Sequence, residues 1–160
     1  MEGVVEDDVV VNPALSLNAY IPDSFANDQD KITLYQEIMG AVSIEALARV
    51  KVRTRDMFGK LPDEVEMLFQ KRMIDLLVID ANVEKVTETP RSLDLELGKD
   101  FINIKGIGNI LFEALIPFLS IVKVSYANNK FKISMTRRKQ WLSDLENILK
   151  CLVNIIEHNK

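Results

Sequence analysis

The five residues Phe58-Gly59-Lys60-Leu61-Pro62 constrain the fold of this chain more than any other stretch. Gly59 suits the position just after a helix, because glycine reaches positive φ without steric cost. Pro62 suits the first position of a helix, where the N–H that it lacks would have no partner in any case. We therefore expect two helices to meet here at a tight corner.

Helical signals flank this corner on both sides. The polar residues 23–30 can cap a first helix that stops at Gly40, and Ser43 can cap a second helix that ends at the corner. A third and clearly amphipathic helix is expected from the corner to about Asp80. On the first helix, the apolar side chains expected to face inward are Ile32, Tyr35, Ile38 and Met39.

The remaining apolar patterns predict an α+β fold. Alternating apolar residues predict an N-terminal strand within residues 9–21. Beyond residue 82, short alternating runs predict a small and mostly antiparallel sheet, together with two further helices. The expected strands span residues 83–87, 93–97, 101–104, 122–126 and 131–135, and the expected helices span residues 110–121 and 139–157.

Composition fits one compact domain. The chain has 160 residues, 48% of them hydrophobic, which is enough for a single core. The formal net charge is −4, and four acidic residues lie within positions 1–8. We expect an acidic N-terminal segment over residues 1–8 and a single domain over residues 9–160. Because residues 9–160 carry no net charge, average charge gives no argument for a nucleic acid or a membrane surface as partner.

Residue chemistry gives little support to an enzyme. Cys151 and His158 are the only cysteine and histidine, which removes the usual zinc ligand sets and nearly every serine or cysteine triad. Gly106 and Gly108 do not open a dinucleotide loop, because Leu111 stands where the third glycine would be. We assign no catalytic, cofactor-binding or metal-binding residue.

A cytoplasmic location without membrane contact is the expectation from the same composition. A single cysteine cannot form an intramolecular disulfide, which suits a reducing compartment. No stretch reaches the ~18 consecutive apolar residues that a membrane span needs. The acidic N-terminus also lacks the basic start of a signal peptide.

Residues 121–139 carry basic side chains and no acidic one. Tyr126, Phe131 and Trp141 lie nearby, so this stretch could bind single-stranded nucleic acid through phosphate contacts and base stacking. The competing interpretation is a solvated hairpin whose lysines keep other chains from pairing with its edge. The basic residues are Lys123, Lys130, Lys132, Arg137, Arg138 and Lys139.

Three segments in order resemble the C-terminal domain of bacterial transcription-repair coupling factors. They are Ala19-Tyr20-Ile21-Pro22-Asp23-Ser24-Phe25, Tyr35-x-x-Ile38, and the run from Asp56 to Val65 that contains the glycine corner. The similarity is strong over roughly residues 15–82. The residues that carry the structural motif are Tyr20, Ile21, Pro22, Asp23, Phe58, Gly59, Leu61 and Pro62.

Two departures from that family pattern concern charge. The family's usual Tyr-Lys-Arg appears here as Tyr35-Gln36-Glu37, so a glutamate stands where an arginine is usual. The family often has an acidic residue three positions before Asp56, and this chain has Arg53 there.

The resemblance implies a non-catalytic regulatory domain of a large ATP-driven DNA translocase in transcription-coupled excision repair. In that family the parent protein binds RNA polymerase and DNA. The domain packs on an N-terminal module similar to the B component of the excision-repair machinery and competes with the A component of that machinery. We expect the contact surface beside the Gly59 corner, with Arg53, Asp56, Asp63, Glu64 and Arg72 as candidates.

Overall fold

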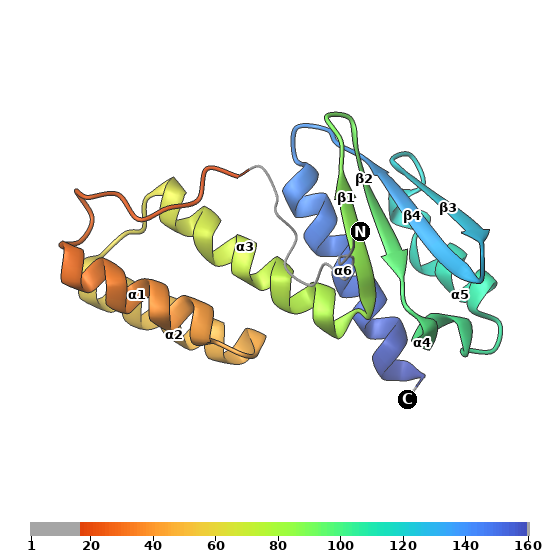
Figure 1. Cartoon of the computed structure of the whole chain (residues 1–160), viewed down its shortest axis with the longest axis horizontal. Coiled ribbons are helices and arrows are strands. Elements are labelled where there is room, and N and C mark those ends of the chain that lie inside the picture. Colours follow the sequence, from red (N-terminus) through yellow and green to blue (C-terminus); the bar gives the residue numbers. More distant parts are fainter. Residues whose placement is uncertain (1–16, 160) are drawn as a thin grey trace, which may run out of the picture. The chain divides into compact units, whose positions relative to one another are not determined.

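The computed structural model describes residues 17–159, which form two compact units (Figure 1). Residues 17–76 form a helical unit, and residues 77–159 form a unit built on a four-stranded sheet. The boundary falls within one long helix, so that helix contributes residues to both units. The α+β class predicted from the sequence is confirmed.

The helical unit contains α1 (Asp28–Gly40), α2 (Ile44–Phe58) and most of α3 (Asp63–Asp80). The side chain of Asn27 accepts a hydrogen bond from the backbone N–H of Asp30 and caps α1. The hydroxyl of Ser43 caps α2 in the same way, through the N–H of Ala46. The predicted three-helix region with its corner at Gly59 is therefore confirmed.

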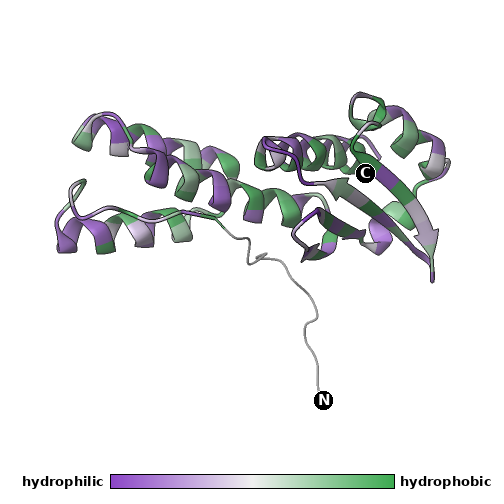
Figure 2. Cartoon of the chain, turned by 90° about the horizontal axis from the view of Figure 1, so that it is seen from above, coloured by the Kyte–Doolittle hydropathy of each residue, from purple (hydrophilic) through white to green (hydrophobic). Residues whose placement is uncertain are grey.

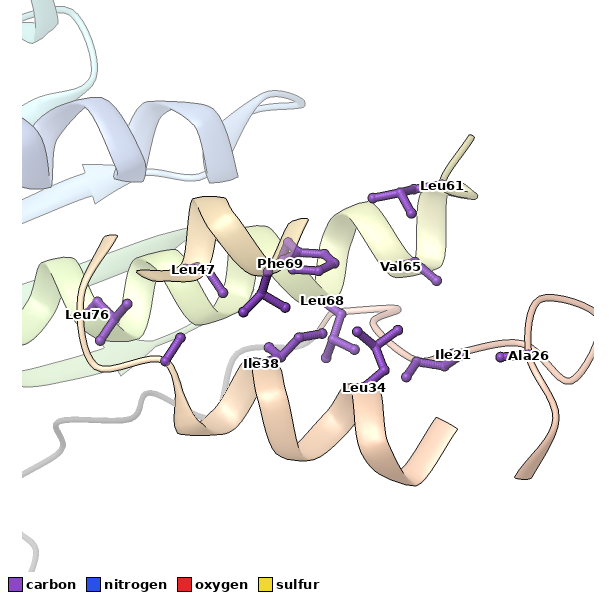
Figure 3. Packing of buried hydrophobic residues seen from close by; sticks show 12 residues of the cluster. Ile21, Ala26, Leu34, Ile38, Leu47, Leu61, Val65, Leu68, Phe69 and Leu76 are labelled. Atoms are coloured by element: carbon purple, nitrogen blue, oxygen red, sulfur yellow. The ribbon is translucent and has the colours of Figure 1, made fainter. Parts of the chain in front are cut away.

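Buried side chains from all three helices form the core of this unit (Figure 3). Leu34 and Ile38 of α1 point toward Leu68 of α3, and Leu47 of α2 lies beside Phe69 of α3. The prediction that Ile32 and Met39 also face inward is wrong, because both are half exposed. The buried stripe of α1 follows the i, i+4 pair at positions 34 and 38 instead.

Residues 17–22 are extended but form no strand, so the predicted N-terminal strand is wrong over this part of its range. Ile21 is buried against the helices, and its backbone N–H donates to the Tyr35 hydroxyl at 3.1 Å. A side chain of α1 thus takes the hydrogen bond that a neighbouring strand would have accepted. Residues 9–16 of the predicted strand, and the acidic segment 1–8, lie outside the described residues.

The second unit is an antiparallel sheet with strand order β1-β2-β4-β3. Its strands are β1 (Val83–Glu88), β2 (Ser92–Leu97), β3 (Val122–Ala127) and β4 (Lys130–Thr136). The register pairs Leu93 with Met135 and Leu95 with Ile133, and all four of these side chains are fully buried. Directly paired residues point to the same face of a sheet, so one face forms the core and the other is polar.

Helices cover the apolar face of this sheet. The long helix α6 (Trp141–His158) and the shorter α5 (Ile107–Ala114) lie behind the strands in Figure 1. Leu145, Ile148, Leu149 and Leu152 of α6 are completely buried. In Figure 2, hydrophobic and hydrophilic residues alternate along the helix ribbons, as expected where a helix buries only one side.

Two predicted elements of this unit need correction. Residues 101–104 form no strand, because α4 (Lys99–Ile102) occupies this segment. The Asn82 side chain accepts a hydrogen bond from the N–H of Asp100, and this contact supports the first turn of α4. The helix predicted over 110–121 ends at Ala114, and a 3-10 turn, η2 (Ile116–Phe118), follows it. Pro117 has no N–H and interrupts the helix there.

Over residues 17–159, no helix is both long enough and apolar enough to cross a membrane.

Candidate interaction surfaces

The corner between α2 and α3 depends on the backbone of Gly59. This residue has φ 85° and ψ −153°, a region that only glycine reaches readily. Its N–H donates to the carbonyl of Arg55 at 2.8 Å, which closes α2. The carbonyl of Pro62 accepts from Val65 and Glu66, both at 3.0 Å, and starts the hydrogen bonding of α3. The positive φ predicted for Gly59 is confirmed, but its extended ψ puts the residue outside the left-handed helical region that was predicted.

Aromatic and apolar side chains fill the inner side of this corner. The rings of Phe25 and Phe58 lie with their centroids 5.1 Å apart, and Leu61 is buried beneath the turn. Pro22 accepts from the N–H of Phe25 at 3.0 Å, so residues 22–25 form a tight turn. Asp23 pairs with Lys31 of α1. Ile21 is buried as expected, whereas Tyr20 is about half exposed.

Glu66 of α3 joins two basic residues of α2. Lys51 Nζ lies 2.7 Å from one carboxylate oxygen, and Arg55 lies 3.5 Å from the other. The hydrogen bond from Lys51 is the main reason that the pKa of Glu66 lies below its ordinary value. Lys51 also lies 5.9 Å from the centre of the Phe69 ring. These basic side chains of α2 hold α3 in place.

Arg53 forms an ion pair with Glu37, the other residue at which the sequence departs from the family pattern. Its guanidinium lies 2.9 Å from the Glu37 carboxylate of α1. In the resemblance described above, an arginine is usual at position 37 and an acid is often found at position 53, so the two charges stand in the opposite order here and form a pair. The contact joins α1 to α2 beside a groove of about 370 Å³ whose lining includes Arg49.

Arg72 lies mostly inside the helical unit, with only 12% of its side chain exposed. Its guanidinium donates to the carbonyl of Ala41 at 3.0 Å and lies 3.9 Å from the Asp75 carboxylate. Burial raises the pKa of Asp75, although Lys71 and Arg72 act in the opposite direction. Arg72 thereby fastens the turn after α1 to α3, and little of it reaches solvent.

The other three candidate residues face solvent near the corner. Asp56 and Asp63 are exposed and Glu64 is half exposed, and none of their carboxylates forms an ion pair or a hydrogen bond with another described residue. Two apolar side chains are exposed near Asp56 in α2: Val52, one turn before it on the same side of the helix, is 55% exposed, and Met57, the next residue in the sequence, is 72% exposed. We call Val52, Asp56 and Met57 the outer face of α2.

The basic stretch forms a hairpin, as predicted, but acidic side chains from elsewhere neutralise much of it. Lys130 lies 2.7 Å from Glu84 and 3.9 Å from Glu96, and Lys132 lies 3.8 Å from Asp94. The contact with Glu84 is the main cause that raises the pKa of Lys130. These acids come from β1 and β2, so the open face of the sheet carries alternating charges.

The two arginines after β4 also have partners within the fold. Arg137 lies 2.8 Å from Glu88 and 4.4 Å from the centre of the Trp141 ring. Arg138 binds both oxygens of the buried Asp144 carboxylate, at 2.7 and 2.9 Å. Lys123 and Lys139 are exposed, and neither side chain forms an ion pair or a hydrogen bond with another described residue. These partners reduce the charge available to a phosphate backbone.

The partners Glu66 and Asp144, and the exposed apolar residues of α2, did not stand out in the sequence. Long-range ion pairs depend on how the helices pack, which local patterns do not show. One signal was present for Glu37, because it and Arg53 depart from the family pattern in opposite directions of charge.

The structure therefore defines an α+β domain with a helical unit, a sheet unit and two charged surfaces. The TRCF domain family model matches residues 15–105, which is more than half of the chain. The chain belongs to the TRCF domain family.

Whole-length relatives and a solved structure agree with this assignment. The chain is 29% identical over 140 residues to the transcription-repair-coupling factor of Staphylococcus aureus strain USA300 and 27% identical over 143 residues to that of Staphylococcus haemolyticus. These matches cover 86% and 89% of this chain but only 12% of each relative. A crystal structure of the C-terminal domain of transcription-repair coupling factor matches with a TM-score of 0.76 at 20% identity, over 91% of this chain and 93% of that one.

Proposed function

We propose that this chain acts as a non-catalytic regulatory domain of a cytoplasmic transcription-repair coupling factor. The parent protein in this proposal is an ATP-driven DNA translocase that acts on stalled RNA polymerase. The domain packs on an N-terminal module similar to the B component of the excision-repair machinery and masks the surface that the A component binds. Membership of the TRCF domain family supports the parent.

The outer face of α2 is the observation that carries the packing role. Val52 exposes apolar surface one turn from the Asp56 carboxylate, which has no partner among the described residues, and Met57 exposes more apolar surface at the end of the helix. Methionine is enriched at protein interfaces, and a charge beside an apolar centre gives orientation to the contact. A small contact is sufficient, because tethering within one polypeptide raises the effective concentration of the two surfaces.

The internal contacts narrow the set of residues proposed to bind the partner. Arg53 pairs with Glu37, and Arg72 fastens a turn of its own unit. Asp56, Asp63 and Glu64 keep their carboxylates available. We therefore place the contact on the acidic side of the corner, centred on Asp56.

Binding between this chain and the separated N-terminal module tests the proposal. Asp56→Lys should weaken binding about tenfold or more, because it reverses the charge at the centre of the proposed contact. Glu113→Lys is the matched control, since Glu113 is an exposed glutamate on a helix of the sheet unit. Equal affinity of wild type and Asp56→Lys rejects the assignment of this surface.

The salt dependence of binding distinguishes the nucleic-acid alternative from the proposed protein contact. Binding through several phosphates falls steeply as salt rises, whereas a contact with a single carboxylate beside apolar side chains depends on salt much less. Lys123 and Lys139 are the basic residues of the hairpin best able to reach a phosphate, because the other four already pair with acids. Salt-sensitive DNA binding that is lost on replacing Lys123 and Lys139 by glutamate would establish the alternative.

A further inference from the structure

The two edges of the sheet differ in how well they are protected from pairing with another strand. β1 has a register shift between Val83 and Lys85 and carries several charged residues. β3 pairs with β4 in unbroken register from Val122 to Ala127, and its only charged residue is Lys123. Charges and bulges are the usual means of blocking an edge strand. Among residues 17–159, β3 therefore has the less protected edge.

The backbone of β3 presents regularly spaced groups on this free edge. The N–H of Thr136 donates to the carbonyl of Ile121 at 2.7 Å, so residues 121 and 136 form a hydrogen-bonded pair. Residues along an antiparallel ladder alternate between bonded and non-bonded pairs. The N–H and C=O groups of Val122, Val124 and Tyr126 consequently point away from β4, toward the free edge.

The side chains of the same three residues lie on the helix-covered face of the sheet. Their partners on β4 are Met135 and Ile133, which are fully buried, and Phe131. The helices no longer cover this face toward the end of β3, where the side chain of Val124 is 40% exposed and that of Tyr126 is 53% exposed. The free edge thus combines unpaired backbone groups with exposed apolar side chains.

We propose that β3 pairs antiparallel with β3 of a second copy of this chain, with Val124 of one copy opposite Val124 of the other. This register also places Val122 opposite Tyr126, so apolar residues meet on the same face. Val122, Val124 and Tyr126, whose backbone groups point outward, then all lie in hydrogen-bonded pairs with the second copy. The inference does not depend on the proposed function.

Charge and register favour a second copy as the occupant. In this pairing Lys123 lies opposite Ser125 on the polar face, so the two lysines are not directly opposed. A shift by one residue would set an apolar side chain opposite a polar one, because it pairs residues that point to opposite faces of the sheet. A shift by two places Val122 beyond the end of the partner strand and loses bonded pairs. One register is therefore preferred.

The two-fold axis of such a pair is perpendicular to the sheet, so both helix layers lie on the same side. Phe112 and Ile116, on the segment that leads into β3, are more than half exposed in this layer. They provide apolar surface that can extend the contact beyond the strands. An interface of one strand pair is nevertheless small, and we expect a dissociation constant in the micromolar range.

Sedimentation equilibrium of the full chain over micromolar to millimolar concentrations tests the pairing. Val124→Lys should weaken dimerisation about tenfold or more, because two lysines then face each other across the axis. Val124→Thr is the matched control, since it keeps the branched β-carbon and should leave the dimer in place. A chain that stays monomeric throughout, or a dimer that Val124→Lys leaves unchanged, overturns the proposal.

Amide hydrogen exchange of the wild-type chain gives a test that does not depend on a variant. The Val124 amide should be protected at high concentration and should exchange faster on dilution, while the Thr136 amide stays protected at both. Protection of Val124 that does not change with concentration would mean that a segment of the same chain covers the edge. That result also overturns the dimer.

Discussion

Gly59 determines whether α2 can turn into α3. Its positive φ with an extended ψ costs a residue with a β-carbon on the order of 1–3 kcal/mol. A β-carbon at this position meets no atom within 4 Å, so backbone strain and not crowding is the expected cause. We predict that Gly59→Ala lowers the free energy of unfolding by about that amount, measured by urea denaturation.

Gly108 is the control for this prediction. It lies within α5, has no left-handed φ and also has open space around its α-carbon. Alanine should therefore stabilise at position 108, by up to about 1 kcal/mol from helix propensity. Equal effects at the two positions would show that the geometry of the corner is unimportant.

Asp75 is a buried carboxyl whose charge is incompletely compensated. Burial raises its pKa in the folded state, so folding favours the protonated form. The stability that this group contributes is present below its unfolded pKa and is lost as the pH rises through the folded pKa. We predict that Asp75→Asn raises the denaturation midpoint at pH 7 and that its advantage over wild type shrinks as the pH falls toward 4.

Asp80→Asn is the matched comparison, because Asp80 is exposed on the same helix. This variant should change stability little at any of these pH values. A lower midpoint for Asp75→Asn at pH 7 would show instead that the Asp75 charge, through Arg72, stabilises the fold.

At the scale of helices, the exchanged charges at positions 37 and 53 form a contact between α1 and α2. Exposed ion pairs contribute about 0.2–1 kcal/mol. Glu37→Arg and Arg53→Glu should each destabilise the chain, because each opposes two like charges. The double variant again places opposite charges at positions 37 and 53, in reversed order, and we predict that it recovers most of the lost stability.

A double-mutant cycle by thermal or chemical denaturation measures this coupling. High salt should reduce the coupling energy, since both side chains are more than 40% exposed. Strictly additive effects of the two substitutions would show that the 2.9 Å contact contributes nothing to stability.

The sequence predicted those elements whose ends carry a local signal. Ser43 caps α2 with its hydroxyl, Gly59 ends it, and Pro62 directly precedes α3, so the bounds of both helices followed from these residues to within one position. The segment after β2 shows the limit of this reasoning. Phe101 and Ile104 suggested a strand, but a contact from Asn82, distant in the sequence, supports a helical turn there.

The sequence predicted which charged residues form the candidate surfaces, but it did not predict the ion pairs that these residues make in the fold. Basic residues 123–139 form a cluster in the sequence, whereas their acidic partners on β1, β2 and α6 approach only when the sheet forms. The outer face of α2 was missed for the same reason. Whether Val52 and Met57 are buried depends on which side of α2 the other helices contact.

At the scale of the whole molecule, the described chain has two cores. Leu47 belongs to the buried cluster of the helical unit, whose members all lie between residues 21 and 76. Leu95 is fully buried in the sheet unit. Removing a buried leucine side chain costs about 2–5 kcal/mol. We predict that Leu47→Ala mainly lowers protection of amides in α1 and α2, and that Leu95→Ala mainly lowers protection in the strands, both measured by hydrogen exchange.

The two variants serve as controls for each other, because each replaces one buried leucine by alanine in a different core. Amides that exchange through local opening report the stability of their own cooperative unit. If either variant lowers protection equally over residues 17–76 and 77–159, the chain unfolds as one unit and the helix α3, which contributes residues to both, transmits the loss. Unequal loss means that each unit can open while the other stays folded.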